Sequence, residues 1–217
     1  PVRNDRLKQV AQDEFKKIPG SPVAYWSSKQ VRDAFEQGTP LGDIAEGKNG
    51  LTTGDNDRFL RRWPEVPAAK TELSASSQEE ASASGKKWFP YNKGGDFRKW
   101  YGNREHLINW EGGGREVFAF KPRAVVRNPS YYFRPAITWT LLSSSYFGVR
   151  HGSQGFIFDV NGMSLFADSA AQELLLPLLA SKVSSFLLKI INPTLAFQVG
   201  DIEKLPVIDL MQDADAA

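Results

Sequence analysis

Apolar residues recur every three or four positions in three segments of the chain, the spacing that predicts helices with one buried face. The three segments are Arg6–Lys17, Ser27–Gln37 and Ser169–Ile191. Ser27 or Ser28 is expected to cap the second helix, because a serine hydroxyl can accept a hydrogen bond from a free backbone amide at a helix start. Gly38 is expected to end it.

The third helix is the strongest of the three predictions. Ser169 can cap it, and Pro177, which lacks a backbone N–H, is expected to kink or split it. Leu179 and Phe186 fall on the apolar stripe and are expected to pack on the core. The lysines of this segment are few, so we predict a structural role for it.

Between the second and third helices, short runs rich in β-branched and aromatic residues alternate with Gly, Asn and Ser, the pattern of short strands. The predicted strands are Leu107–Trp110, Val117–Phe120, Ile137–Leu142, Tyr146–Val149, Gly155–Asp159 and Met163–Ala167. The stretch WEGGGREV is interpreted as a glycine-rich hairpin. Together these patterns predict an α+β fold, with an irregular mixed β-sheet of roughly six to eight strands flanked by helices.

Residues 67–85 (PAAKTELSASSQEEASASG) are small, polar and poor in large apolar groups. Such a segment buries too little surface to offset its loss of conformational entropy, so a flexible insert is predicted. We expect residues 1–38 to form a helical arm, residues 39–210 to form one domain that contains the insert, and residues 211–217 to be a frayed tail. Because the chain starts at Pro1, we expect it to be part of a longer protein.

Composition excludes several classes of site. The chain has no cysteine, which rules out disulfides and thiolate metal sites and suits a reducing cytoplasm. Its two histidines argue against an all-protein zinc site. No apolar run reaches the roughly 20 residues of a membrane span. We therefore expect a cytoplasmic protein with no membrane partner and no metal site.

The net charge of +2 conceals an uneven distribution. Residues 86–134 hold 11 Lys and Arg against 4 Asp and Glu, a balance of +7 that leaves −5 for the rest of the chain. The same window holds 12 Phe, Tyr and Trp residues. Positive charge among aromatic residues is typical of a nucleic-acid surface. A basic face over an aromatic core would give the same composition.

Two segments carry most of this pattern. In GLTTGDNDRFLRRW (residues 50–63), turn-forming residues run directly into basic and aromatic ones. Either the aromatic residues close a core beneath a solvated turn, or the stretch contacts something flat and negatively charged. In KKWFPYNKGGDFRKWYGN (residues 86–103), lysine and arginine can neutralise phosphates, while paired glycines allow close approach to a ligand.

Catalytic patterns are weak by comparison. NPSY (Asn128–Tyr131) approaches the Asn-Pro-Pro-aromatic motif of amino-group methyltransferases, but no glycine-rich turn that would hold S-adenosylmethionine precedes it, and a turn explains it better. Glu111 and Glu116 could form an acid–base pair, although the hairpin accounts for them. His151 could contact a phosphate or act as a base.

Four stretches carry a resemblance to a known family: GLTTGDNDRFLRRW, KWFPYNKGGDFRKWYGN, NPSYYFRPAITWTLLSSSYFGVRHGSQGFIFD and SKVSSFLLKIINPTLAFQVGDIEKLPV. From about Pro22 to Ile208 the chain resembles the C-terminal half of the adenine-specific DNA methyltransferases of BREX phage-defence systems, the PglX family. More distantly it resembles the target-recognition domains of Type I specificity subunits. Ala180 stands where those domains usually have Asn.

The resemblance implies sequence-specific recognition of double-stranded DNA and no catalysis by this segment, since the family's S-adenosylmethionine pocket lies outside the matched region. It implies that residues 1–38 connect to a methyltransferase domain. Its partners would be that domain and DNA, along with other defence-system proteins or phage-encoded DNA mimics. In that case Phe59 and Trp63 would anchor the opening turn. The alternative function is a docking module for other components of the defence complex.

With both the charge pattern and the resemblance in view, we predict a set of DNA-contacting side chains. They are Thr53, Asn56, Arg58, Arg61, Arg62, Lys86, Lys87, Tyr91, Asn92, Lys93, Arg98, Lys99, Tyr101, Arg104, Arg134, Arg150 and His151. We expect those between Lys86 and Arg104 to share one exposed face.

Overall fold

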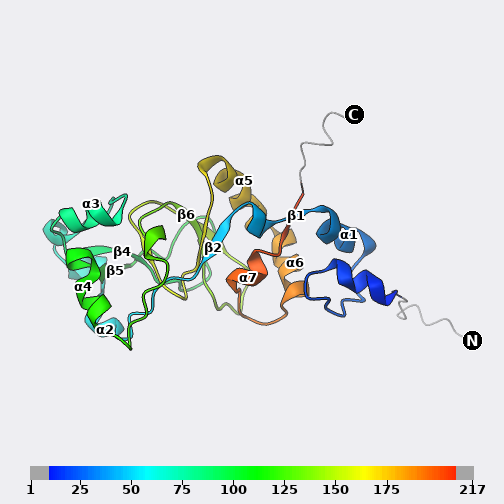
Figure 1. Ribbon diagram of the computed structural model, residues 1–217, viewed down its shortest axis with the longest axis horizontal. Helices are drawn as coiled ribbons and strands as arrows, with labels where there is room; N and C mark the ends of the chain where they lie inside the picture. The colour runs from blue at the N-terminus through cyan, green and yellow to red at the C-terminus, as the bar shows by residue number, and fades with distance from the viewer. Residues whose placement is uncertain (1–9, 209–217) are drawn as a thin grey trace, which may run out of the picture.

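The computed structural model describes residues 10–208, which form three small β-sheets (Figure 1). A mixed sheet has the order β3-β5-β4-β8, in which only β4 and β8 are parallel, and an antiparallel sheet has the order β2-β9-β6-β7. Strands β1 and β10 pair separately. The strands are β1 (Thr39–Pro40), β2 (Glu46–Lys48), β3 (Leu60–Arg62), β4 (Trp88–Asn92), β5 (His106–Asn109), β6 (Ala136–Trp139), β7 (Val149–Gly152), β8 (Ile157–Phe158), β9 (Ser164–Phe166) and β10 (Pro206–Val207).

The helices lie toward the two ends of an elongated molecule (Figure 1). Helices α2, α3 and α4 lie near β4 and β5 at one end, α1 lies toward the other, and α5, α6 and α7 lie between the middle of the molecule and α1 (Figure 1). The α-helices are α1 (Lys29–Gln37), α2 (Asn56–Phe59), α3 (Gln78–Ala83), α4 (Glu111–Ala119), α5 (Ser169–Leu179), α6 (Lys182–Ile191) and α7 (Val199–Ile202). Helices together with one mixed and two antiparallel sheets confirm the predicted α+β class, although the strands form three sheets and not the single irregular sheet expected.

The antiparallel sheet separates two hydrophobic cores. Leu165 of β9 packs into a core shared with α1, α5 and α6, whereas the next residue, Phe166, packs into a core shared with β3, β4, β5, α3 and α4. Ile137 and Ala136 of β6 divide in the same way. This follows from strand geometry, because successive side chains point to opposite faces of a sheet. One sheet therefore holds both ends of the molecule together.

Four predicted strands are confirmed and two are wrong. Strands β8 and β9 lie within the predicted runs Gly155–Asp159 and Met163–Ala167, and β5 and β6 overlap Leu107–Trp110 and Ile137–Leu142 but each begins one residue earlier. Val117–Phe120 was predicted as a strand but falls at the end of α4. Of Tyr146–Val149 only Val149 enters a strand, β7.

The predicted hairpin at WEGGGREV is also wrong. Gly112, Gly113 and Gly114 have φ values of 57°, 74° and 84°, a left-handed turn that leads into the right-handed part of α4. A Cβ at Gly114 would lie 2.8 Å from the Trp110 ring. The glycines therefore allow tight packing against Trp110, and they do not reverse the chain between two strands.

The segment Ser169–Ile191 forms two helices bent by 78°, α5 and α6. Asp168, one residue before the predicted cap, accepts from the backbone N–H of Ala171 at 2.8 Å. Pro177 lies inside α5, and the second helix begins where Ser181 caps it. Leu179 is fully buried as expected, but Phe186 is 46% exposed and the prediction that it packs on the core is wrong. In residues 10–208 no single helix is long and apolar enough to cross a membrane; α5 and α6 together pass only on length and composition.

Residues 67–85 were expected to be a flexible insert that buries little surface, but the structure shows that they form helical turns and bury side chains. The segment contains a 3-10 turn (Ala68–Lys70) and α3, and α3 packs against α4. Ala75 and Ala81 are buried in the core, and the Trp110 indole donates to Gln78 Oε1 at 3.0 Å. Small side chains are what allow this segment to lie close against its neighbours.

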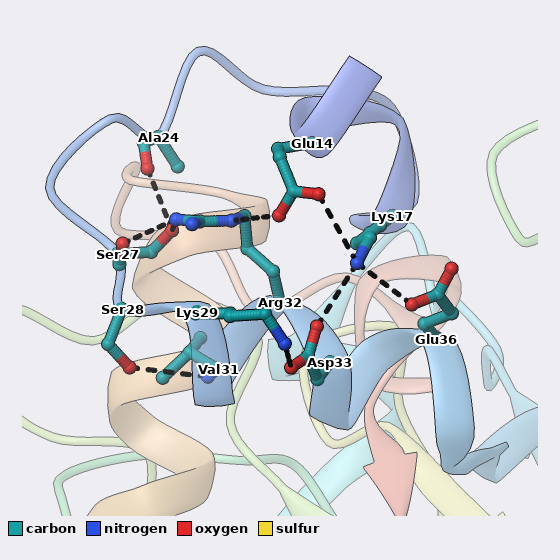
Figure 2. A network of polar contacts seen from close by, with 10 residues as sticks. All are labelled: Glu14, Lys17, Ala24, Ser27, Ser28, Lys29, Val31, Arg32, Asp33 and Glu36. Carbon is teal, nitrogen blue, oxygen red and sulfur yellow. Dashed lines mark hydrogen bonds and ion pairs between the residues drawn. The ribbon is translucent and has the colours of Figure 1, made fainter. Parts of the chain in front are cut away.

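Within the arm, ion pairs and hydrogen bonds between charged side chains connect the segment Gln12–Lys17 to α1 (Figure 2). Arg32 donates to Glu14 Oε2 at 3.1 Å and to the Ser27 carbonyl at 2.6 Å, while Lys17 lies 3.1 Å from Asp33. The predicted Ser28 cap and the stop at Gly38 are confirmed. The described part of the first predicted helix, Gln12–Lys17, is a 3-10 helix. Residues 6–9 of that prediction and the predicted tail lie outside the described residues.

Candidate nucleic-acid interface

The stretch from Gly50 to Asp57 is a tightly constrained turn. A Cβ at Gly50 would lie 1.9 Å from the Phe158 carbonyl oxygen, so only glycine fits there. Gly54 adopts a φ of 73°. The Thr53 hydroxyl donates to Asn56 Oδ1 at 2.7 Å, and Asp55 caps α2 by accepting from the Arg58 amide at 3.0 Å. The turn residues fix the backbone between the two strand regions at residues 51 and 60.

This turn borders a shallow hollow, here called the turn hollow, of about 210 Å³. It is lined by residues 52–56, Lys93 and residues 159–161, and so brings together three predicted contacts, Thr53, Asn56 and Lys93. The Lys93 ammonium lies 2.8 Å from Asp159 Oδ2. Asp159 is 1% exposed, so this ion pair ties the lysine to the interior. The turn hollow therefore contains a neutralised pair rather than an unmatched positive charge.

The three arginines that follow the turn take different positions. Arg58 stacks on Phe59 and Phe120 and lies 3.9 Å from Glu116. Arg61 donates to two backbone carbonyl oxygens and lies over Trp88, while Arg62 is exposed.

The two aromatic residues of this stretch also differ. Phe59 is fully buried and anchors the turn to the core, as expected, but Trp63 is 64% exposed and does not. Exposed aromatic and basic groups thus lie side by side after the turn.

A second hollow, here called the arginine pocket, gathers five predicted contacts. Asn92, Arg104, Arg134, Arg150 and His151 all line it, from strands and loops that are far apart in sequence. Arg104 donates to Ser153 Oγ at 3.2 Å and to the His151 carbonyl at 2.9 Å, which fixes its position. The walls are completed by aromatic side chains, Phe156, Phe158 and Phe166.

Arg150 forms the floor of this pocket. Its side chain is 2% exposed, and its guanidinium donates only to the hydroxyls of Thr138 at 3.3 Å and Thr140 at 3.4 Å. Burial lowers the pKa of Arg150 to about 10, which still leaves it charged at neutral pH. Within residues 10–208 no carboxylate lies within ion-pair distance of Arg104, Arg134 or Arg150.

The arginine pocket adjoins a larger hollow of about 500 Å³, here called the side hollow. The two share Arg134, His151 and Ser153, and the side hollow adds Gln154, Gln172 and Glu173. Glutamine side chains can read base edges, so Gln154 and Gln172 are candidate contacts that our sequence analysis missed. The signal for Gln154 was present in the loop sequence HGSQG, whereas Gln172 lies in a helix that we interpreted as structural.

The basic segment from Lys86 to Arg104 is not gathered in one hollow. Lys86 donates to the Ala69 carbonyl, and Lys87 lies 3.6 Å from Glu111 at the α4 end of the molecule. Arg98 donates to the neighbouring Phe97 carbonyl. Lys99 lines a separate hollow with Tyr146 and the start of α6. The expectation of one shared face is therefore replaced by several small basic sites.

Two predicted aromatic contacts have opposite environments. Tyr91 is fully buried, and its hydroxyl donates to Asp159 Oδ2 at 2.6 Å, so it does not reach the surface. Burial raises the pKa of Tyr91 well above its usual value. Tyr101 is exposed, with the Arg104 guanidinium 4.3 Å from its ring centre. Asn92 is buried as well, and donates to the Gly162 carbonyl.

The weak catalytic candidates have structural explanations. Asn128 adopts left-handed φ and ψ values of 50° and 45°, and its amide donates to the Asn49 carbonyl, which makes NPSY a turn. Glu111 and Glu116 each lie near a basic side chain, Lys87 and Arg58 respectively.

Among the described residues, the arginine pocket thus gathers three arginines and His151 without an ion-paired carboxylate. No family model matches the chain. The chain is 40% identical over 218 residues to the adenine-specific methyltransferase PglX of Lacticaseibacillus casei (strain Zhang), a match that covers 95% of this chain and 18% of that protein. It is 40% identical over 210 residues to the adenine-specific methyltransferase BrxX of Escherichia coli O9:H4 (strain HS), covering 95% and 16%. The chain thus spans less than a fifth of either relative.

Proposed function

We propose that this chain recognises a specific sequence in double-stranded DNA on behalf of an adenine-specific DNA methyltransferase of a phage-defence system. The observation that carries the proposal is the arginine pocket beside the side hollow. Within residues 10–208, three arginines and His151 meet there without an ion-paired carboxylate, and phosphates of DNA would supply the negative charge. Homology to part of two adenine-specific methyltransferases supports the same assignment.

In this proposal phosphates are held by arginine and bases are read by amides. Arg104 and Arg134 would fix the position of the duplex, and Gln154 and Gln172 of the side hollow would contact base edges in the major groove. The catalytic domain, which would hold S-adenosylmethionine, lies outside this chain and would flip the target adenine. The remaining exposed cations, including Arg62, Arg98 and Lys99, would add non-specific attraction.

Salt dependence of DNA binding tests the proposal. Arg134 is exposed, so Arg134→Ala should leave the fold intact, weaken binding to all duplex sequences and lower the salt slope by roughly 1. Arg115→Ala is the matched control, because Arg115 is an exposed arginine of α4 away from both hollows. Equal effects of the two substitutions in fluorescence anisotropy would refute the proposed interface.

A second candidate function, docking of another protein component, is favoured by a different surface. An apolar groove of about 500 Å³ lies between α1, α6 and β10, lined by residues that include Val31, Ala34, Val183, Phe186 and Val207. Binding through such a groove should change little with salt, whereas DNA binding through phosphates should weaken steeply. The two functions are therefore separable by the same titration.

A further inference from the structure

Arg150 carries a charge whose partner is missing from the described chain. A guanidinium has five N–H donors, and the two hydrogen bonds that Arg150 makes are long and end on neutral hydroxyls. Buried arginines are normally paired with a carboxylate or another anion, because desolvation of an unpaired charge is strongly unfavourable. Nothing within residues 10–208 fills that role within 4 Å.

The charged groups around Arg150 are almost all basic. Arg104, Arg134 and His151 line the same pocket. Of the nearby acids, Glu105 acts on Arg150 as a charge but forms no ion pair with it. The Asp159 carboxylate accepts hydrogen bonds from Lys93 and Tyr91, and Glu173 lines the neighbouring side hollow. Within residues 10–208 the basic side chains of the arginine pocket therefore have no ion-paired acid, and an anion from outside would balance their charge.

The size of the pocket limits what can enter. Its interior has room for about 20 Å³, which is enough for one water-sized group and too little for a nucleobase. One oxygen of an oxyanion meets this limit. Arg134 is exposed and Arg104 is half buried, and both line the same pocket as Arg150. This geometry favours a tetrahedral anion held from several sides.

We propose that the arginine pocket binds a single phosphate group, with one non-bridging oxygen directed to the Arg150 guanidinium and the others to Arg104 and Arg134. The inference rests on the proposed function for its source, a backbone phosphate of duplex DNA. Free phosphate has the same chemistry and would occupy the same pocket. Arg150 thus acts as a buried phosphate ligand and is not a structural arginine of the core.

Thermal unfolding of the full 217-residue chain in inorganic phosphate, compared with chloride at equal ionic strength, tests the pocket directly. Phosphate should raise the Tm of the wild type. Arg150→Met should abolish that rise and leave the Tm in chloride unchanged or higher, because it removes an unpaired buried charge. A lower Tm in chloride together with a retained phosphate response would show that Arg150 is structural and would overturn the proposal.

Arg134→Met keeps the test decisive if Arg150→Met does not fold. Arg134 is exposed, so its loss should weaken phosphate binding by about tenfold at unchanged stability, the effect of one charge-assisted hydrogen bond. Arg115→Met on α4 should have no effect. Phosphate affinity that is the same in wild type and Arg134→Met would refute the pocket.

Duplexes with a single neutral methylphosphonate distinguish the two sources of phosphate. One backbone position should be found where the substitution weakens wild-type binding by about tenfold, with no further loss in Arg134→Met. A phosphate response without DNA binding would support the pocket and refute the proposed function. DNA binding with neither a phosphate response nor a sensitive position would refute the pocket and leave the function standing.

Discussion

The ammonium of Lys93 lies 2.8 Å from the carboxylate of Asp159, which is 1% exposed in the interior beneath the turn hollow. Asp159 also accepts from the Tyr91 hydroxyl at 2.6 Å and from the Asn161 amide at 2.8 Å. The carboxylate therefore joins β4 to the loop after β8. Lys93, expected from sequence to contact DNA, is part of this joint.

Replacing Lys93 with Ala should destabilise the fold. The substitution removes one charged hydrogen bond from a buried carboxylate that keeps its other donors, so we expect a loss of about 1.5–3 kcal/mol in urea unfolding. Lys99→Ala is the control, since Lys99 is exposed and has no ion pair within residues 10–208; its effect should stay within about 0.5 kcal/mol. If Lys93→Ala keeps full stability and only DNA affinity falls, Lys93 is a ligand contact after all.

Gly50→Ala should be strongly destabilising. The new methyl group would lie 1.9 Å from the Phe158 carbonyl oxygen, and neither backbone segment can move away without breaking its hydrogen bonds, among them that from the Leu51 amide to the same oxygen. We expect a loss of about 3 kcal/mol, the upper end of the usual cost of overpacking. Thermal unfolding by circular dichroism measures it.

Gly200→Ala is the matched control for that substitution. A Cβ at Gly200 would meet no atom within 4 Å, and the residue lies in α7. Alanine is the better helix former there, so stability should rise by about 0.5 kcal/mol. Equal destabilisation by both substitutions would mean that the close approach at Gly50 is not the cause.

The elements that were predicted correctly are those whose apolar residues repeat on one buried side. Strands β5, β6, β8 and β9 were found because alternating or continuous apolar runs hold core residues. Val117–Phe120 was wrongly predicted as a strand, because a short apolar run fits a strand or a helix equally well. The packing of α4 on α3 favours the helix. The kink or split expected at Pro177 is present, but the break falls at Ala180, where the capping hydrogen bond of Ser181 begins α6.

The site was predicted less well than the fold, because residues adjacent in sequence face different parts of the molecule. Neighbours in sequence, such as Tyr91, Asn92 and Lys93, face the core, the arginine pocket and the turn hollow respectively. The residues that do meet, Arg104, Arg134 and Arg150, come from three distant segments. Sequence clustering identified the residue types, but sheet register decides which of them converge.

Leu179→Ala and Phe186→Ala should differ in cost, although the sequence pattern placed both on one apolar stripe. Leu179 is fully buried between α5 and the sheet, so its truncation should cost about 2–5 kcal/mol. Phe186 is 46% exposed in the apolar groove, and its truncation should cost about 1–2 kcal/mol. Chemical denaturation measures both. A cost for Phe186→Ala as large as that for Leu179→Ala would show that the groove is closed in solution.

The charged network of the arm should make stability fall in acid (Figure 2). The hydrogen bond from Arg32, followed by Lys17, holds the pKa of Glu14 below its ordinary 4.5, and Lys29 and Lys17 hold the pKa of Asp33 below 3.8. For a carboxylate with a lowered folded-state pKa, the stabilisation is fully present above the unfolded value and is lost as pH falls through the folded one. The Tm should therefore drop below about pH 4.5.

Asp33→Asn should flatten part of that acid dependence, because the amide has no proton to take up at this pH. Lys29→Met should flatten it as well, since Lys29 is the largest cause of the lowered pKa of Asp33 and lies 2.6 Å from its carboxylate. Scanning calorimetry between pH 7 and about pH 3 compares the three proteins, and the difference between wild type and Asp33→Asn isolates this group from the other acids of the chain. Superimposable acid profiles for wild type and Asp33→Asn would show that the arm does not hold this ion pair in solution.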